Sequence, residues 1–518
     1  MELIQKSIHM DQVKCASAAQ ITIEDDINIT DAKPDVFQLV MEKGNVDIDE
    51  VRAVEDHVHI RGMLKFTVLY ISEEEVNRPA CMEGSLSFSE TVYMDGVSAG
   101  DVVLVRPVLE DLSVGMINSR KLSVQALAEL FLSVELQQET MAAVGVEDAQ
   151  DVEVQKKIMP ALDLAISKKD IFRIREEVEL PGGMPNIFSL LWQNCRLRGI
   201  TFHLMDGKMS LQGEIEFFFL YEGEGEERPV LWHSAVLPVN GVVECQGMRE
   251  GMLENIRCRM GHQEIEVKAD ADGEERRIAL DLVLDLDMKL YEDIQVEMIS
   301  DLYSVSREVK VVTQEGRCKQ LLTKNTGKTN VSGRFKVEAG LPRMQQVGGS
   351  FGEIQVGSVE PCAEGIRVDG ILQVRALYAS QDAELPVYGI RGTIPYSYVL
   401  EVPGWDADCQ YEMEPSLEQL SVTMLDGDEA DVKAALSFSC LAFRVHEEPM
   451  VTDVQVSALD PEKLSSLPGI VAYIVRDDDT LWEIGKKYYV PVARMKEMND
   501  LQSEEVKPGD KLLVVKGF

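Results

Sequence analysis

The chain has 518 residues, of which 45% are hydrophobic and 27% charged, and its formal net charge is −39 at pH 7. This is the composition of an ordinary folded protein, and the length predicts about three to five domains because a single core rarely grows beyond roughly 250–300 residues. The acidic excess disfavours nucleic acids and anionic membranes as direct ligands, because both repel a negative surface.

The opening of the chain and the later segments lack the patterns of an exported or membrane protein. MELIQKSIHMDQVKCASAAQITIEDD has no basic start followed by an uninterrupted apolar run, as a signal peptide would. No segment contains the roughly 18 uncharged apolar residues that a membrane-spanning helix needs. We therefore expect a cytoplasmic protein with no transmembrane segment.

Nine cysteines are scattered singly, with no Cys-x-x-Cys pair. Such a set favours reduced, mostly buried thiols over a disulfide framework. The only close histidine pair, His57 and His59 in HVH, would share one face of a strand, but no third ligand is apparent. We interpret HVH as an ordinary strand and predict no metal site and no cofactor.

Three stretches share one pattern: IRGMLKFTVLYISEE, LQGEIEFFFLYEGEG and VDGILQVRALYASQD. In each, a glycine is followed eight residues later by a tyrosine and preceded 28 residues earlier by a proline. The triplets are Pro34, Gly62 and Tyr70, then Pro185, Gly213 and Tyr221, then Pro342, Gly370 and Tyr378. The glycines recur at intervals of 151 and 157 residues, which indicates a tandem repeat of domain-sized units.

The secondary structure within each unit is predicted to be mostly strand. MLKFTVLY alternates apolar and polar residues, whereas EIEFFFLY is apolar enough in its second half to be covered on both faces. A later pair of strands recurs in KLSVQALAELFLSVEL, RRIALDLVLDLDMKLY and ADVKAALSFSCLAFRVH, each after a turn-rich segment. The fold class is therefore mainly β, with an antiparallel sandwich or open barrel in three copies.

The repeated residues have structural interpretations. We expect each glycine to mark a bulge or a close approach of two backbones, and each tyrosine to close a sheet edge with a solvent-facing hydroxyl. The segments DVFQLVME after Pro34 and NIFSLLWQ after Pro185 are apolar and helix-like, and the third copy lacks such a segment.

Two short motifs resemble catalytic or phosphate-binding sequences. GGSFG, Gly348 to Gly352, matches the Gly-x-Ser-x-Gly nucleophile elbow, but it lacks the preceding apolar strand and the following helix, so we interpret it as a flexible loop. NTGKTN, Asn325 to Asn330, has Leu322 where a phosphate loop needs its first glycine. We find no catalytic residues and predict that the protein is not an enzyme.

The last fifty residues form a compact pattern of their own. VAYIVR reads as a strand, and DDDT supplies Asp479 and Thr480 as caps for the helix LWEIGKKY. A second helix spans about 492–498 with Pro491 at its start, and KLLVV returns as a strand. We expect a small βααβ domain at 470–518, a linker at 456–469, and three β domains at 1–150, 151–305 and 306–455.

This C-terminal pattern resembles the LysM domain in the order and spacing of YIV, DTL, MKEMN and KPGDKLLV. The resemblance implies a binding groove for N-acetylglucosamine polymers between two loops. The groove residues would be Asp478, Asp479, Thr480 and Leu481 on one side, and Met498, Asn499, Asp500 and Leu501 on the other. Asp478 replaces the usual glycine and Tyr489 a commonly small residue, which weighs against sugar as the ligand.

The three repeats resemble SPOCS domains, and their combination with one LysM domain resembles the SipL-like family of spore-coat morphogenesis proteins. This resemblance implies a scaffold in the mother-cell cytoplasm, at the forespore surface, that docks to the coat ATPase SpoIVA through its LysM domain and meets other coat proteins. An exposed Trp482 would serve as an anchor for the partner, because aromatic side chains concentrate interface energy; a structural tryptophan is the alternative. The rival hypothesis is a cell-wall protein that binds peptidoglycan.

Overall fold

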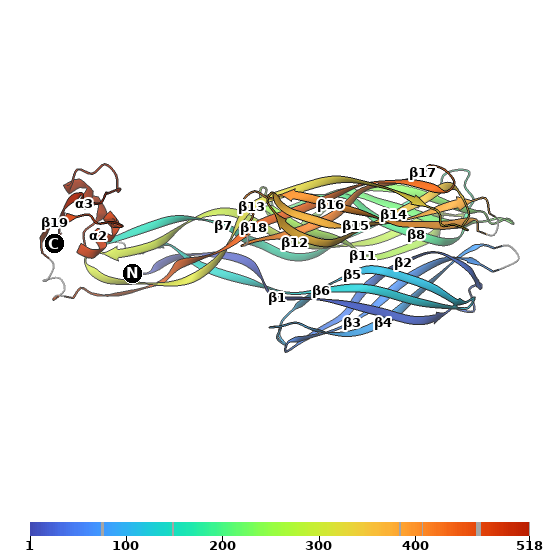
Figure 1. Ribbon diagram of the computed structural model, residues 1–518, viewed down its shortest axis with the longest axis horizontal. Helices are drawn as coiled ribbons and strands as arrows, with labels where there is room; N and C mark the ends of the chain where they lie inside the picture. The colour runs from blue at the N-terminus through green and yellow to red at the C-terminus, as the bar shows by residue number, and fades with distance from the viewer. Residues whose placement is uncertain are drawn as a thin grey trace.

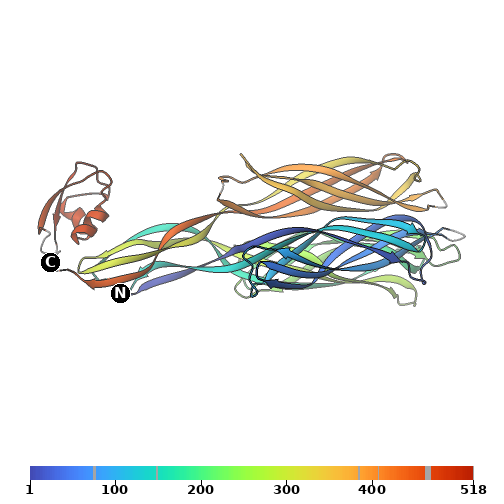
Figure 2. The same cartoon turned by 60° about the horizontal axis from the view of Figure 1, so that its bottom comes forward.

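The computed structural model describes residues 1–73, 77–147, 150–382, 385–406, 408–460, 462 and 468–516. Three elongated β sandwiches lie side by side at one end of the molecule. A narrower stalk extends from them, and a small domain with two helices lies at the far end of the stalk (Figures 1 and 2).

Each sandwich consists of two three-stranded antiparallel sheets, which confirms the predicted sandwich in three copies. In the first, β1 (Leu3–Asn28), β6 (Lys121–Val146) and β5 (Val103–Asn118) face β2 (Val36–Val54), β3 (His57–Ser72) and β4 (Pro79–Tyr93). In the second, β7 (Val152–Glu179), β12 (Glu275–Ser304) and β11 (Leu253–Ala269) face β8 (Ile187–Met205), β9 (Lys208–Gly223) and β10 (Val230–Glu244). In the third, β13 (Arg307–Lys336), β18 (Glu429–Ala458) and β17 (Cys409–Met424) face β14 (Met344–Cys362), β15 (Gly365–Ser380) and β16 (Val387–Glu401).

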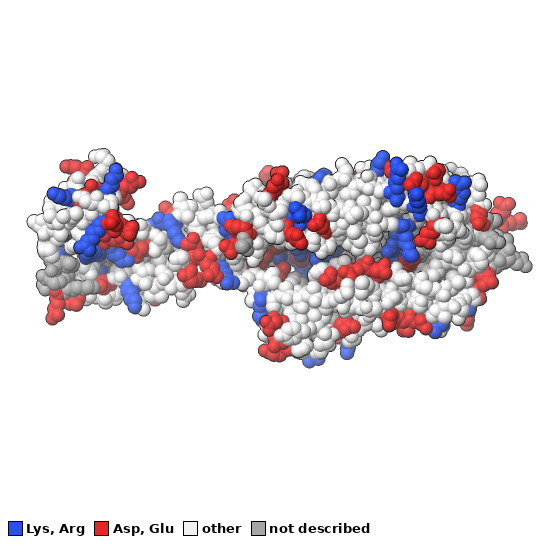
Figure 3. Space-filling model, viewed as in Figure 1, with Lys and Arg blue, Asp and Glu red and all other residues white. Residues whose placement is uncertain are grey.

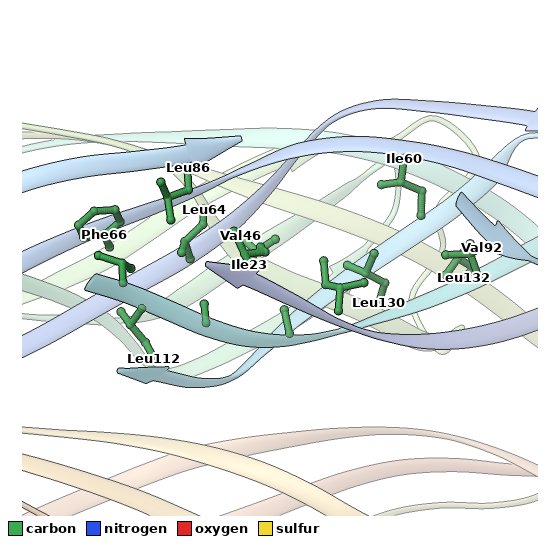
Figure 4. Close-up of a cluster of buried hydrophobic side chains, with 14 of the residues drawn as sticks. Ile23, Val46, Ile60, Leu64, Phe66, Leu86, Val92, Leu112, Leu130 and Leu132 are labelled. Atoms are coloured by element: carbon green, nitrogen blue, oxygen red, sulfur yellow. The ribbon is translucent and has the colours of Figure 1, made fainter. Parts of the chain in front are cut away.

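The core of each sandwich is built from alternate residues of facing strands. Figure 4 shows Ile60 and Leu64 of β3 among side chains from the opposite sheet, such as Leu130 and Leu132 of β6. All four are at most 2% exposed. Because full burial of such a side chain stabilises the fold by roughly 1.5–3 kcal/mol, the period-two pattern of the sequence determines which face turns inward.

The segments after Pro34 and Pro185 are strands β2 and β8, so the helix-like interpretation is wrong. Two of the three bulges of each strand lie within these segments and explain the error, since they interrupt the alternation of inward and outward side chains. The register shifts lie between Val36 and Gln38 and between Leu39 and Met41 in β2, and β8 has two in the matching segment. The third copy has a strand, β14, at the same place.

The three repeated tyrosines are fully buried rather than solvent-facing. Each hydroxyl donates a hydrogen bond to the carbonyl oxygen of the repeated proline 36 residues upstream, with distances of 3.1 Å for Tyr70, 3.3 Å for Tyr221 and 2.9 Å for Tyr378. The prediction of a wet hydroxyl was therefore wrong. The fixed spacing of proline and tyrosine reflects this hydrogen bond, which joins the residues before β2, β8 and β14 to the following strands β3, β9 and β15.

The repeated glycines have the predicted role. Gly62 and Gly370 each lie opposite a bulge in the preceding strand, and Gly213 lies beside one. A Cβ atom at Gly62 would lie 2.4 Å from the carbonyl oxygen of Asp47, so a side chain there would force the strands apart.

The later pairs of predicted strands are instead single long strands. β6, β12 and β18 contain 26, 30 and 30 residues. Beyond the sandwiches they pair only with β1, β7 and β13, which gives three two-stranded ribbons. These ribbons form the stalk, which comprises residues 3–13, 135–146, 152–163, 292–304, 307–319 and 445–458.

The ribbons and the sandwiches are joined by shared apolar clusters. Ile8, Met159 and Cys318, one from each ribbon, are buried together within the stalk. On strands β3, β9 and β15, the residue before each repeated tyrosine is a leucine, and these three leucines share one buried cluster between the sandwiches. They are Leu69, Leu220 and Leu377. The second half of EIEFFFLY is thus covered on both faces, as predicted.

The sequence GGSFG lies in strand β14, so the prediction of a loop is wrong. A Cβ atom at Gly349 would lie 2.7 Å from the ring of Phe218, and one at Gly348 would lie 3.1 Å from Trp232. These glycines therefore let aromatic side chains of the second sandwich pack against the third. NTGKTN lies in strand β13, and HVH lies in β3 with both histidines exposed, in line with the plain strand.

The expected boundaries 150/151 and 305/306 fall in the turns between β6 and β7 and between β12 and β13, whereas 455 falls inside β18. All nine cysteines are free thiols. In the described part of the chain, no group of three or more His, Cys, Asp or Glu residues is arranged to hold a metal ion. Over the same residues, no helix has the length and apolarity to cross a membrane.

Candidate partner-binding site in the C-terminal domain

The C-terminal domain has the expected order of elements. β19 (Ile470–Ile474) pairs antiparallel with β20 (Lys511–Val515), and α2 (Leu481–Tyr488) and α3 (Val492–Met498) lie between them in the chain. Leu481, Ile484 and Met495 from the helices are buried with Leu512 and Val514 from β20. This core fixes the two loops that the sequence analysis assigned to a groove.

The first loop, residues 478–481, is largely occupied with its own structure. The carboxylate of Asp479 accepts hydrogen bonds from the backbone N–H of Arg476 and the hydroxyl of Tyr473, both at 2.8 Å, and these bonds lower the pKa of Asp479. The hydroxyl of Thr480 caps α2 by accepting the N–H of Glu483 at 3.1 Å. Leu481 is 1% exposed. Asp478 and Thr480 are exposed, and Asp478 has a φ of +70° where the resemblance expects glycine.

The second loop, residues 498–501, is held by Asn499. Its side-chain amide donates to the carbonyl oxygens of Met495 and Leu513 at 2.8 and 2.9 Å and accepts the N–H of Leu513 at 2.6 Å. Leu501 packs on the same core as Leu481, and Met498 is half-buried, whereas Asp500 is exposed. The structure therefore brings both loops to one core, but it leaves few of their predicted groups free to bind a ligand.

Trp482 lies against the stalk and is half-buried, so the expectation of an exposed tryptophan is wrong. Its indole N–H donates to Asp301 of β12 at 2.8 Å, and its ring meets the edge of Tyr303 with centroids 4.9 Å apart. Lys486 lies 2.7 Å from both carboxylate oxygens of the same Asp301. Trp482 thus has the alternative, structural role of attaching the C-terminal domain to the stalk.

Further contacts complete this attachment. The buried hydroxyl of Tyr303 donates to the carbonyl oxygen of Val490 at 2.8 Å, and the hydroxyl of Tyr489 donates to Glu308 at 2.7 Å. A Cβ atom at Gly485 would lie 2.6 Å from the hydroxyl oxygen of Tyr303, so the close approach needs glycine. The bulky Tyr489, noted as a departure from the usual pattern, therefore faces the stalk.

The outer face of the β19–β20 sheet carries apolar side chains that the described part of the chain leaves exposed, a feature that the sequence analysis missed. Ile470, Ile474 and Leu513 are 67%, 59% and 42% exposed. The pairing puts Ile470 opposite Val515, Ala472 opposite Leu513, and Ile474 opposite Lys511 on this face. An exposed sheet normally turns polar side chains to solvent, whereas a contiguous apolar face marks an interaction surface. The lack of polar alternation in KLLVV and IVAYI was the available signal.

Comparison with protein-family models gives two results. The model described as SipL, SPOCS domain, matches residues 35–117, 186–268 and 344–425, one in each sandwich. The LysM domain model matches residues 473–515. Neither the search of curated proteins nor the search of solved structures found a significant match.

Proposed function

The chain is a SipL-like protein, with three SPOCS domains followed by a LysM domain, and on that premise we propose that it is a scaffold of spore-coat assembly that docks to a SpoIVA-like coat ATPase through its LysM domain. SPOCS and LysM domains are non-catalytic binding domains, and this domain content supports a role in sporulation or cell-wall binding. The proposed location is the mother-cell cytoplasm at the forespore surface, where other coat proteins would also be met.

The outer face of β19–β20 is the observation that carries the proposal. Strand β19 lies in the domain at the far end of the stalk, away from the sandwiches (Figure 1). Ile470, Ile474 and Leu513 are exposed apolar residues on the outer face of the sheet that β19 forms with β20. Residues 471–518 hold 8 basic and 9 acidic residues, so they contribute −1 of the net charge and the rest of the chain −38. A protein partner therefore meets an almost neutral apolar surface instead of the repulsive acidic body.

Co-purification of the full chain with the coat ATPase tests this proposal. Deletion of residues 470–518 and the double substitution Ile470→Ser/Ile474→Ser should both abolish capture. Ile158→Ser is the matched control, because Ile158 in the stalk is also 67% exposed. Undiminished capture by the double variant would exclude this face, and capture by the deleted chain would move the site to the SPOCS domains.

Peptidoglycan binding is the second candidate function, and the LysM match at 473–515 favours it. The internal bonds of Asp479, Thr480 and Asn499 weigh against it, because a sugar would have to compete for these groups. A pull-down on purified peptidoglycan distinguishes the two. Retention that chitin oligomers block, and that Asp478→Ala/Asp500→Ala removes, would support the cell-wall alternative.

A further inference from the structure

A cavity of about 1080 Å³ lies where the three sandwiches join the stalk. Residues from the three sheets that contain the long strands β6, β12 and β18 line it, including Ser17 of β1, Leu286 of β12 and Phe443 of β18. Figure 3 shows the furrow between the first sandwich and the other two, with charged side chains along it. Its volume is slightly above the roughly 300–1,000 Å³ of ligand pockets, and such pockets favour domain interfaces.

Three arginines converge on this cavity in a protein that is otherwise strongly acidic. Arg106 comes from β5 of the first sandwich, and Arg257 and Arg259 come from one face of β11 in the second. Arg257 lies 3.3 Å from Glu412 and 3.6 Å from Glu414 of the third sandwich. Within the described residues, Arg106 and Arg259 have no carboxylate within 4.0 Å; Arg106 instead stacks on Phe131 at 4.9 Å.

These two guanidinium groups form no ion pair among the described residues, although Asp285 lies opposite Arg259 in the pairing of β11 with β12. Burial lowers the pKa of Arg106, and the charges of Arg259 and Arg257 lower it further. Repulsion between like charges at a half-buried position is relieved when an anion lies between them. A guanidinium group binds a carboxylate through two parallel hydrogen bonds, which makes this pair suited to an acidic side chain.

The remaining lining restricts the class of anion. Asp285, Asp287, Asp170 and Glu135 also line the cavity, and together they repel a ligand as highly charged as a polyphosphate. Apolar side chains are exposed beside the arginines: Val13 is 54% and Ile171 62% exposed. The cavity therefore combines guanidinium groups with exposed apolar side chains and with carboxylates.

We propose that this cavity is a second docking site, which takes a peptide segment of a protein partner carrying one acidic side chain between apolar residues. Arg106 and Arg259 bind the carboxylate, and Val13, Phe131 and Ile171 contact the apolar neighbours. Because all three sandwiches contribute to the lining, the site exists only when they are assembled around the stalk. It is independent of the LysM face.

Selection of a random heptapeptide library, displayed on phage, against the full chain tests the proposal. Selected sequences should share one Asp or Glu flanked by apolar residues. A synthetic peptide of the selected sequence should bind at least about tenfold more weakly to Arg106→Gln/Arg259→Gln, a loss of about 1.4 kcal/mol. Its Glu→Gln or Asp→Asn version should lose binding to the same extent. Arg343→Gln, which affects a surface pair with Asp428, is the control and should bind normally.

Thermal unfolding separates a binding role from a structural one. Because Arg106 and Arg259 have no ion-pair partner among the described residues, the double variant should unfold at or above the wild-type temperature. The proposal is overturned if selection yields no enrichment over the double variant, if the enriched peptides lack an acidic residue, or if pyrophosphate displaces the peptide more effectively than acetate does.

Discussion

The carboxylate of Asp11 lies 2.5 Å from the ammonium group of Lys319, although 308 positions separate the two residues in the chain. The same carboxylate accepts hydrogen bonds from Lys289 at 3.0 Å and from Tyr291 at 3.3 Å. Asp11 lies on β1, Lys289 and Tyr291 lie on β12, and Lys319 lies on β13, which are the long strands that run from the three sandwiches into the stalk. One buried acid therefore joins all three sandwiches where they meet the stalk.

Asp11→Asn should destabilise the assembly strongly. Lys319 is 4% exposed, and among the described residues Asp11 is its only ion-pair partner, so the substitution leaves a buried ammonium group unpaired. Lys289, which is 8% exposed, keeps Glu135 at 2.8 Å. Breaking a buried ion pair from one side costs about 3–5 kcal/mol. Thermal and urea unfolding measure the loss, with Asp26→Asn as the control, because the pair of Asp26 with Lys121 is exposed. If both variants unfold at the same temperature and the same urea concentration, Asp11 does not stabilise the assembly as proposed.

The contribution of Asp11 should also depend on pH. Burial raises the pKa of this carboxyl, but the charges and hydrogen bonds of Lys319 and Lys289 outweigh burial and lower the pKa from 3.8 to about 2. Because the folded value lies below the unfolded one, the stabilisation is complete above about pH 5, amounts to about 2 kcal/mol, and is lost as the pH falls from 4 to 2. The stability difference between wild type and Asp11→Asn should be constant from pH 5 to 7 and shrink below pH 4. If the stability difference between wild type and Asp11→Asn instead grows below pH 4, folding does not lower the pKa of Asp11.

The repeated tyrosines offer a matched test within each sandwich. Tyr378→Phe removes the 2.9 Å bond to the carbonyl oxygen of Pro342 and leaves that buried acceptor unpaired. We expect a loss of about 1–2 kcal/mol in chemical unfolding, with the larger part due to the unsatisfied group. Tyr93→Phe is the control, since Tyr93 is 59% exposed. No loss for Tyr378→Phe would mean that the repeated spacing reflects packing alone.

Asp301 should determine whether the LysM domain stays attached to the stalk. Asp301→Ala removes the acceptor of Trp482 and the partner of Lys486 together, and should weaken the attachment of the LysM domain to the stalk, so that a protease cleaves between the two faster. Limited proteolysis between residues 456 and 469 measures release. Asp293→Ala, an exposed acid on the same strand, should leave the cleavage rate unchanged. Unchanged cleavage of Asp301→Ala would indicate that Tyr303 and Tyr489 suffice for attachment.

The sequence predicted the repeat and the sandwich because both depend on local periodicity. MLKFTVLY alternates as a strand does, and Leu64, Phe66 and Tyr70 are buried on the face that the alternation selects. Leu69 is buried on the other face, against the neighbouring sandwiches. The bulges in β2 and β8 defeated the same reasoning, since an extra residue shifts the inward face and makes an apolar strand resemble a helix.

The candidate site was harder to predict because its contacts are long-range. Trp482 has a polar partner 181 residues away in the chain, and nothing in LWEIGKKY indicates Asp301. The stalk was equally hidden, since the bulges after Val13, Leu290 and Leu321 bend long strands without ending them. The sequences IVAYI and KLLVV already show the apolar residues of the outer face of β19–β20. Two strands of five residues are, however, too short for the alternation to show which of these residues are exposed.

The most direct test of the central claim is site-specific cross-linking. A photoreactive phenylalanine analogue at position 474, on the outer face of β19, is irradiated in the full chain with the coat ATPase, and position 158 serves as the control. The account predicts a covalent complex with the ATPase from position 474 and none from position 158. No complex from 474 in a mixture that still co-purifies, or transfer of the label to muropeptides instead, would contradict it.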